Sequence, residues 1–123
     1  FCALSGNTDA HLKNWSLIYA DGRTPRLAPA YDLVSTVVYQ GKVDDEMALD
    51  LGHSKRFEDI NETSFCRLAT VCSFDYAEIR AWVRSAAERV RTIWSEDGKE
   101  LGYQADERAL IERHLDRIPL GRH

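Results

Sequence analysis

Residues 75–96 carry the feature that most constrains the fold, a regular helical alternation of apolar and charged side chains. Apolar residues recur there at intervals of three and four, while arginines and glutamates occupy the other positions. Asp75 is suited to cap the start of such a helix, and Gly98 is suited to end it. A helix with one apolar face needs other elements to cover that face. The apolar positions are Tyr76, Ile79, Trp82, Val83, Ala86, Val90, Ile93 and Trp94.

Two further segments have helical periodicity. Residues 106–118 place apolar side chains on one face, and Pro119 then prevents the helix from continuing. Residues 63–74 follow Asn61, which is a suitable N-cap. The expected apolar stripe of this second segment consists of Phe65, Leu68, Ala69 and Cys72.

The N-terminal part has β character. Residues 15–19 and 27–33 predict the two strands of a hairpin, because the Asp21-Gly22 pair between them favours a tight turn. Pro29 restricts the second strand to an edge or a partly irregular segment. Residues 47–51 predict another short strand. Together these patterns predict one mainly α (α+β) domain over residues 1–123, with a small β-hairpin near the N-terminus.

Charge, hydropathy and cysteine content argue against several classes of function. The net charge of −4 is small and both signs are mixed along the chain, which does not favour nucleic-acid or membrane-surface binding. No apolar run approaches the roughly 20 residues of a membrane-spanning helix. Three cysteines without C-x-x-C spacing indicate reduced thiols, and therefore a cytoplasmic location, rather than disulfides or structural zinc.

Three oxygen-bearing side chains near the N-terminus form a candidate site. Asn14 follows Asp9 by five residues, and Asp32 comes after the predicted hairpin. Closure of the hairpin would bring Asn14 and Asp32 together. One carboxylate can then accept a hydroxyl proton, while the amide and the other carboxylate can hold Mg²⁺ against ATP phosphates, as phosphoryl transfer requires.

Each of these residues also has an ordinary structural interpretation. Asp9 can serve in a turn or as an N-cap, and Asn14 can satisfy its own loop backbone. Asp32 can cap a helix that begins near residue 34. His11 is commonly a packed loop histidine, and Lys13 is commonly a solvated charge. Trp15 is expected in the core.

Two segments carry a resemblance to a known family. Residues 6–16 read Gly-Asn-Thr-Asp-Ala-His-Leu-Lys-Asn-Trp-Ser, and residues 27–33 read Leu-Ala-Pro-Ala-Tyr-Asp-Leu. With the hairpin between them, they resemble the catalytic and metal-binding region of HipA-like serine/threonine kinases, the toxin kinases of bacterial type II toxin–antitoxin modules. The D-x-H-x-x-N core also resembles the loop of phosphoinositide kinases. The similarity extends over essentially all 123 residues, with residues 34–123 resembling the helical part of the C-terminal lobe.

The resemblance implies roles for five residues. Asp9 matches the catalytic aspartate, which orients and deprotonates the Ser or Thr hydroxyl of a protein substrate. Asn14 and Asp32 match the Mg²⁺-binding residues. His11 and Lys13 occupy family positions beside the bound ATP, where Lys13 can add charge near the transferred phosphoryl group. The resemblance further implies ATP and Mg²⁺ as cofactors and an antitoxin protein as a partner.

The resemblance also implies a second, N-terminal lobe that covers the phosphates and supplies an ATP-contacting lysine. Residues 1–123 begin just before the catalytic loop, so we expect this chain alone to have no appreciable kinase activity. An alternative is a degenerate, non-catalytic lobe that acts as a protein-binding module, for example by docking an antitoxin. A coding sequence that extends upstream with a Gly-rich loop would favour the kinase.

Overall fold

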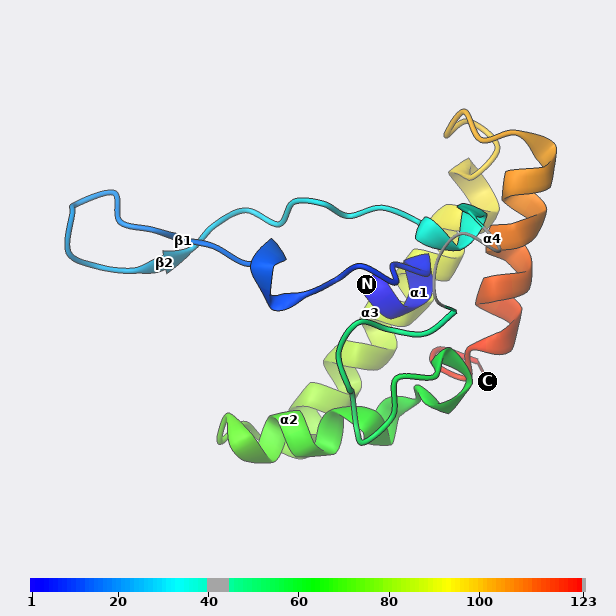
Figure 1. Cartoon of the computed structure of the whole chain (residues 1–123). Coiled ribbons are helices and arrows are strands. Elements are labelled where there is room, and N and C mark those ends of the chain that lie inside the picture. The colour runs from blue at the N-terminus through cyan, green and yellow to red at the C-terminus, as the bar shows by residue number, and fades with distance from the viewer. Residues whose placement is uncertain (40–44, 123) are drawn as a thin grey trace.

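The computed structural model describes residues 1–39 and 45–122, which form a helical body from which a long arm projects (Figure 1). The fold is mainly helical with one small antiparallel hairpin, as the sequence predicts. Its α-helices are α1 (Cys2–Ser5), α2 (Cys66–Val71), α3 (Tyr76–Asp97) and α4 (Ala105–Arg117). Short 3₁₀ helices are η1 (Leu12–Asn14), η2 (Thr36–Tyr39), η3 (Phe57–Asp59) and η4 (Glu62–Phe65), and the strands are β1 (Leu17–Ile18) and β2 (Arg26–Leu27).

Helix α3 is the predicted amphipathic helix, and its caps are confirmed. The Asp75 carboxylate accepts the backbone N–H of Glu78 at 2.9 Å, and Gly98 follows the last turn. The buried face is narrower than the periodicity suggests. Val83 and Ala87 lie in the core, whereas Trp82 is 69% exposed. Because adjacent residues lie about 100° apart around a helix, only one of Trp82 and Val83 can face the centre of the core.

Helix α4 supplies the second layer of the core. Ile111 and Leu115 are buried on it, and Ile118 is fully buried where the helix ends in extended backbone before Pro119. Ala3 and Leu4 of α1 pack into the same cluster. The short N-terminal helix is therefore anchored in the core, and this anchor precedes the predicted site.

Arg91 on α3 fastens the C-terminal segment to the body. Its guanidinium donates hydrogen bonds to the carbonyl oxygens of Ile118 and Leu120 at 2.9 to 3.1 Å. Partial burial lowers the pKa of this arginine. Two other arginines of the predicted charged face, Arg80 and Arg84, form ion pairs with Glu62 on η4. This face of α3 therefore contacts η4 in addition to solvent.

The predicted helix over residues 63–74 is split into η4 and α2. Asn61 is its N-cap, with the side chain accepting the N–H of Thr63 at 2.9 Å in a capping box with Ser64. The predicted apolar stripe is only partly right, because Ala69 is buried but Leu68 is 49% exposed. The predicted strand over residues 47–51 is wrong. Only an isolated bridge between Leu51 and Ser54 forms there, because the chain reverses at once.

The arm, residues 9–33, carries the β-hairpin, whose strands are shorter than predicted. Leu17 pairs with Leu27 and Ile18 with Arg26, so a longer loop than a two-residue turn closes the hairpin. Asp21 organises that loop by accepting three hydrogen bonds, which lower its pKa to about 2. Pro29 lies just beyond the short second strand, in irregular backbone.

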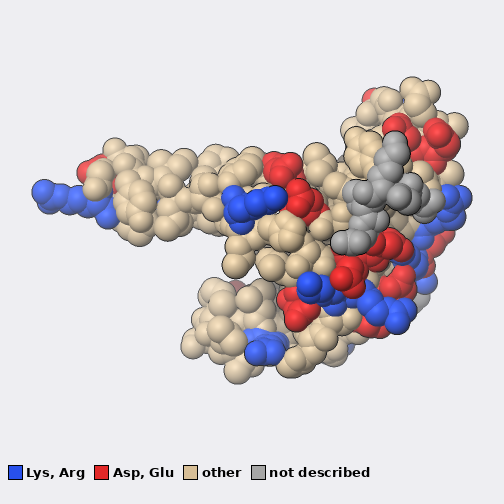
Figure 2. Space-filling view, viewed as in Figure 1, with Lys and Arg blue, Asp and Glu red and all other residues tan. Residues whose placement is uncertain are grey.

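The arm has no core of its own. Trp15, which the sequence places in the core, is 57% exposed, because it lies on the arm away from the buried cluster. Most of the arm surface carries uncharged side chains, with charged groups gathered at its tip and near its base (Figure 2). Within residues 1–39 and 45–122, no helix combines the length and the apolar character that crossing a membrane requires.

Candidate phosphoryl-transfer site

The candidate site lies on the two chain segments that connect the hairpin strands to the body. The Asn14 amide group donates one hydrogen bond to the Asp9 carbonyl oxygen at 2.9 Å and another to the Asp32 carboxylate at 2.8 Å. The predicted convergence of Asn14 and Asp32, 18 residues apart, is therefore confirmed. One amide group joins the three residues, and their catalytic and metal-binding roles stay predictions.

His11 and Lys13 both lie against the Asp9 carboxylate. His11 Nε2 is 3.2 Å and Lys13 Nζ is 3.6 Å from the same oxygen, Asp9 Oδ1. All three side chains are roughly half exposed or more, so solvent weakens these contacts. The arrangement concentrates two potential cations at one exposed carboxylate, which suits a site for phosphate groups.

Tyr31 joins the two chain segments beside Asn14 and Asp32. Its hydroxyl donates to the Lys13 carbonyl oxygen at 3.1 Å, and it lies 2.7 Å from the Ser16 hydroxyl. Since the single phenolic proton is used by Lys13, Ser16 is the donor in the second bond. These bonds hold the segment after η1 against the segment that leads to Asp32.

The donor chemistry of Asn14 and Asp32 fits Mg²⁺. With its nitrogen bound to Asp9 and Asp32, the Asn14 amide leaves its oxygen Oδ1 without a hydrogen bond to any described residue, and Asp32 keeps one carboxylate oxygen free in the same sense. Mg²⁺ is commonly held by one or two side-chain oxygens together with waters and substrate phosphates. Among residues 1–39 and 45–122, no three His, Cys, Asp or Glu side chains gather as an all-protein metal site.

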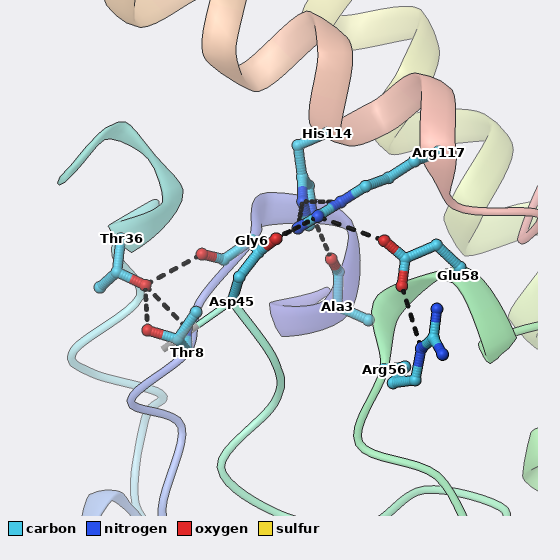
Figure 3. A network of polar contacts seen from close by, with 9 residues as sticks. All are labelled: Ala3, Gly6, Thr8, Thr36, Asp45, Arg56, Glu58, His114 and Arg117. Carbon is cyan, nitrogen blue, oxygen red and sulfur yellow. Dashed lines mark hydrogen bonds and ion pairs between the residues drawn. The ribbon is translucent and has the colours of Figure 1, made fainter. Parts of the chain in front are cut away.

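Two residues that the sequence analysis left without a role underlie the site. Asn7 is 1% exposed, and its side chain contacts the backbone of both Asp9 and Asp32. Thr36 lies on η2 and bonds to Thr8 and Gly6 (Figure 3). The Asn7 contact with Asp9 is local, but its contact with Asp32 and the contacts of Thr36 with Thr8 and Gly6 span 25 to 30 residues, which no local pattern reveals.

A polar cluster around the buried His114 anchors α1 (Figure 3). His114 of α4 contacts the Ala3 carbonyl oxygen through Nε2 at 2.7 Å, and its Nδ1 accepts from Arg117 at 3.0 Å. Arg117 also binds the Asp45 carboxylate through both terminal nitrogens and contacts Glu58. Burial lowers the pKa of His114, and the hydrogen bonds from Arg117 lower the pKa of Asp45.

Comparison with known proteins places the fold and the motif in one family. The family model described as the HipA-like C-terminal domain matches residues 1–94. A protein named putative kinase Y4dM from Sinorhizobium fredii is 37% identical over 123 residues, which cover 99% of this chain and 30% of that protein. A putative kinase from Haemophilus influenzae is 49% identical over 39 residues, or 32% of this chain and 11% of its own length.

A solved structure supports the same fold. The chain in a complex of HipA, HipB and operator DNA from the Shewanella oneidensis MR-1 toxin–antitoxin system superimposes with a TM-score of 0.70. The match has 20% sequence identity and covers 94% of this chain and 27% of that one. The present chain thus spans less than a third of the length of the Y4dM protein and of the Shewanella chain. By its family match and its sequence relatives, the chain belongs to the HipA-like C-terminal domain family.

Proposed function

We propose that the chain is the C-terminal part of a HipA-type protein kinase that transfers the γ-phosphoryl group of ATP to a Ser or Thr hydroxyl of a protein, with Mg²⁺. The observation that carries the proposal is the Asn14 amide, which joins the Asp9 loop to the Asp32 carboxylate through two hydrogen bonds of 2.8 and 2.9 Å. Relatives named as putative kinases support the same reaction class.

In this proposal each side chain has a separate task. The exposed Asp9 carboxylate accepts the proton of the substrate hydroxyl and orients that hydroxyl for attack. Asn14 Oδ1 and Asp32 hold Mg²⁺. A metal ion held by these residues would supply positive charge against the charge that develops on the ATP phosphates during transfer.

His11 and Lys13 bring positive charge to the same place. Both lie within 3.6 Å of Asp9 Oδ1, where they can meet the negative phosphates of bound ATP. Phosphoryl transfer depends mainly on positioning and on electrostatic stabilisation, so these two contacts would assist both nucleotide binding and transfer.

The test uses the protein that carries this chain, together with its Mg²⁺·ATP. Asn14→Ala and Asp32→Ala should weaken metal-dependent nucleotide binding, measured by calorimetry, because each removes a ligand. Asp9→Ala should leave binding unchanged and abolish phosphorylation, measured by transfer of labelled phosphate. Asp106→Ala, an exposed carboxylate on α4, is the matched control and should change neither. Equal ATP affinity in all three site variants would contradict the assignment.

The exposed arm favours a second candidate function, protein binding without catalysis. Three of its apolar side chains, those of Leu12, Trp15 and Leu27, are 57% to 73% exposed. An antitoxin protein is the proposed partner, since the Shewanella HipA was solved together with HipB. Antitoxin binding by a full-length protein that shows no Mg²⁺·ATP-dependent transfer would favour this candidate over the kinase.

A further inference from the structure

Asn7 joins the two chain segments that carry the candidate acidic residues. Its Oδ1 accepts the backbone N–H of Asp9 at 2.9 Å, and its Nδ2 donates to the backbone carbonyl oxygen of Asp32 at 3.0 Å. The side chain is 1% exposed, and within the described part of the chain it makes no hydrogen bond to either carboxylate. It therefore fixes the backbones of Asp9 and Asp32 relative to each other and does not itself occupy their carboxylates.

Asn7 is itself held by the core. Its own N–H donates to the Cys2 carbonyl oxygen at 2.9 Å, which continues the end of α1. Ala3 and Leu4 of that helix are buried in the hydrophobic cluster. The position of the Asn7 side chain is consequently set by the body of the protein, although the residues that it joins lie at the base of the exposed arm.

The backbone of Asp32 explains why such a contact matters. Asp32 has a φ of +56°, in the left-handed region that non-glycine residues rarely adopt. This conformation determines where the carboxylate points, and in it Oδ2 accepts from the Asn14 amide at 2.8 Å. The hydrogen bond from Asn7 to the Asp32 carbonyl holds this conformation in place.

Thr36 provides a second connection, one step closer to the body (Figure 3). Its hydroxyl donates to the Gly6 carbonyl oxygen at 3.0 Å, and it accepts the Thr8 N–H at 2.7 Å and the Thr8 hydroxyl at 2.8 Å. These three bonds use the full capacity of the hydroxyl group. The segments 6–9 and 32–37 are thus joined by the bonds of Asn7 and of Thr36 and by the Val37 N–H, which donates to the Gly6 carbonyl oxygen at 3.1 Å. Of these connections, the one made by Asn7 is adjacent to the site.

We infer that Asn7 is a positioning residue for the metal-binding pair, which sets the orientation of Asp32 toward Asn14 without touching metal, nucleotide or substrate. The inference rests on the proposed function, because it assumes that Asn14 and Asp32 hold a divalent cation. Loss of supporting groups around metal ligands typically weakens metal affinity by about 10- to 100-fold. An Asn7 variant that keeps the fold should therefore bind the cation at least about tenfold more weakly.

The test is a titration of the 123-residue chain with Mn²⁺, monitored by NMR. The readout is the paramagnetic broadening of the ¹⁵N-resolved amide signals. Asn7→Asp keeps an acceptor for the Asp9 N–H and loses the donor to Asp32. Asn7→Ser is its uncharged counterpart, since a hydroxyl oxygen replaces the acceptor and the side chain is too short to join both segments. Both variants should shift the signals of Asp32 and of the Asn14 side chain, keep the signals of the core, and show the weaker Mn²⁺ affinity.

Asn61→Asp is the matched control. Asn61 makes the same pair of contacts elsewhere, accepting the N–H of Thr63 and donating to the Asp59 carbonyl oxygen. This control should leave the Mn²⁺ affinity unchanged, which separates a local effect from the general cost of losing such an asparagine.

The outcomes separate this inference from the proposed function. A wild-type chain without Mn²⁺ broadening near Asn14 and Asp32 would overturn the metal assignment, and the inference with it. If the wild type binds Mn²⁺ there and both Asn7 variants bind equally well, only the inference is overturned. Loss of the core signals in both Asn7 variants would also overturn it, because Asn7 would then be a folding residue.

Discussion

Replacement of His114 by glutamine should remove an acid-sensitive contribution to stability. His114 is 3% exposed, and the 2.7 Å contact between Nε2 and the Ala3 carbonyl oxygen places the ring proton on Nε2. Nδ1 faces two N–H groups of Arg117, at 3.2 and 3.0 Å. A second ring proton would have to sit on Nδ1, where it would displace these donors and bring two positive groups together.

The sign of the pH dependence follows from this geometry. Burial is the main cause that lowers the pKa of His114 below its usual 6.5, and the Arg117 charge adds to it, while the Ala3 carbonyl and the Asp45 and Glu58 carboxylates act in the opposite direction. The unfolded chain therefore takes up the proton first as the pH falls. The contribution of neutral His114 to the free energy of unfolding is complete above about pH 6.5. As the pH falls from there to the lowered folded-state pKa, this contribution decreases by at most about 1.4 kcal/mol per pH unit.

The assay is urea unfolding of the wild type and of His114→Gln at several values between about pH 8 and pH 5.5. Glutamine can still donate to the Ala3 carbonyl, but it does not titrate. At the alkaline end the variant should be less stable by about 1–3 kcal/mol, since the edge-to-face contact with Phe57 at 4.6 Å is lost. The difference should shrink below about pH 6.5. Parallel stability curves for the two proteins over this range would refute the reasoning.

Three other predictions concern stability and use urea unfolding at neutral pH. Gly6→Ala should lower the free energy of unfolding by more than about 2 kcal/mol, because φ is +67° and the new Cβ would lie 2.6 Å from a valine side chain on η2. Gly102→Ala, at φ +78° with open space around the new Cβ, should lower it less. Equal losses in the two variants would contradict the clash at residue 6. Asp75→Ala should cost about 1 kcal/mol and Asp75→Asn little, since asparagine caps equally well; a similar loss in both would exclude capping. Trp82→Gln should stay within about 0.5 kcal/mol, whereas Val83→Ala should cost about 2 kcal/mol, and the reverse order would mean that Trp82 is covered.

The arm shows how far the sequence could predict a shape. The Asp21-Gly22 pair and the flanking apolar runs correctly predicted a hairpin, because turn chemistry is local. The same runs also suggested a buried tryptophan at residue 15, and this was wrong. A two-stranded hairpin is marginally stable alone, so exposure of its side chains depends on what packs against it and not on its own pattern.

The sequence by itself determined the elements whose causes are local. Periodicity and caps predicted α3 and α4, and the motif that surrounds Asp9 and Asn14 identified the family. Convergence of Asn14 with Asp32 followed from the hairpin between them.

Tertiary structure decided which side chains are buried and which hold the site together. The contact of Asn7 with Asp32 and that of Thr36 with Gly6 join residues 25 and 30 positions apart, and His114 reaches a carbonyl 111 positions away. Such bonds leave no periodic signal, because a buried polar group takes whichever partner the packed elements bring within reach. The proposed chemistry of the candidate site therefore rests on a short motif, whereas its geometry is set by the packing of α1, η2 and α4.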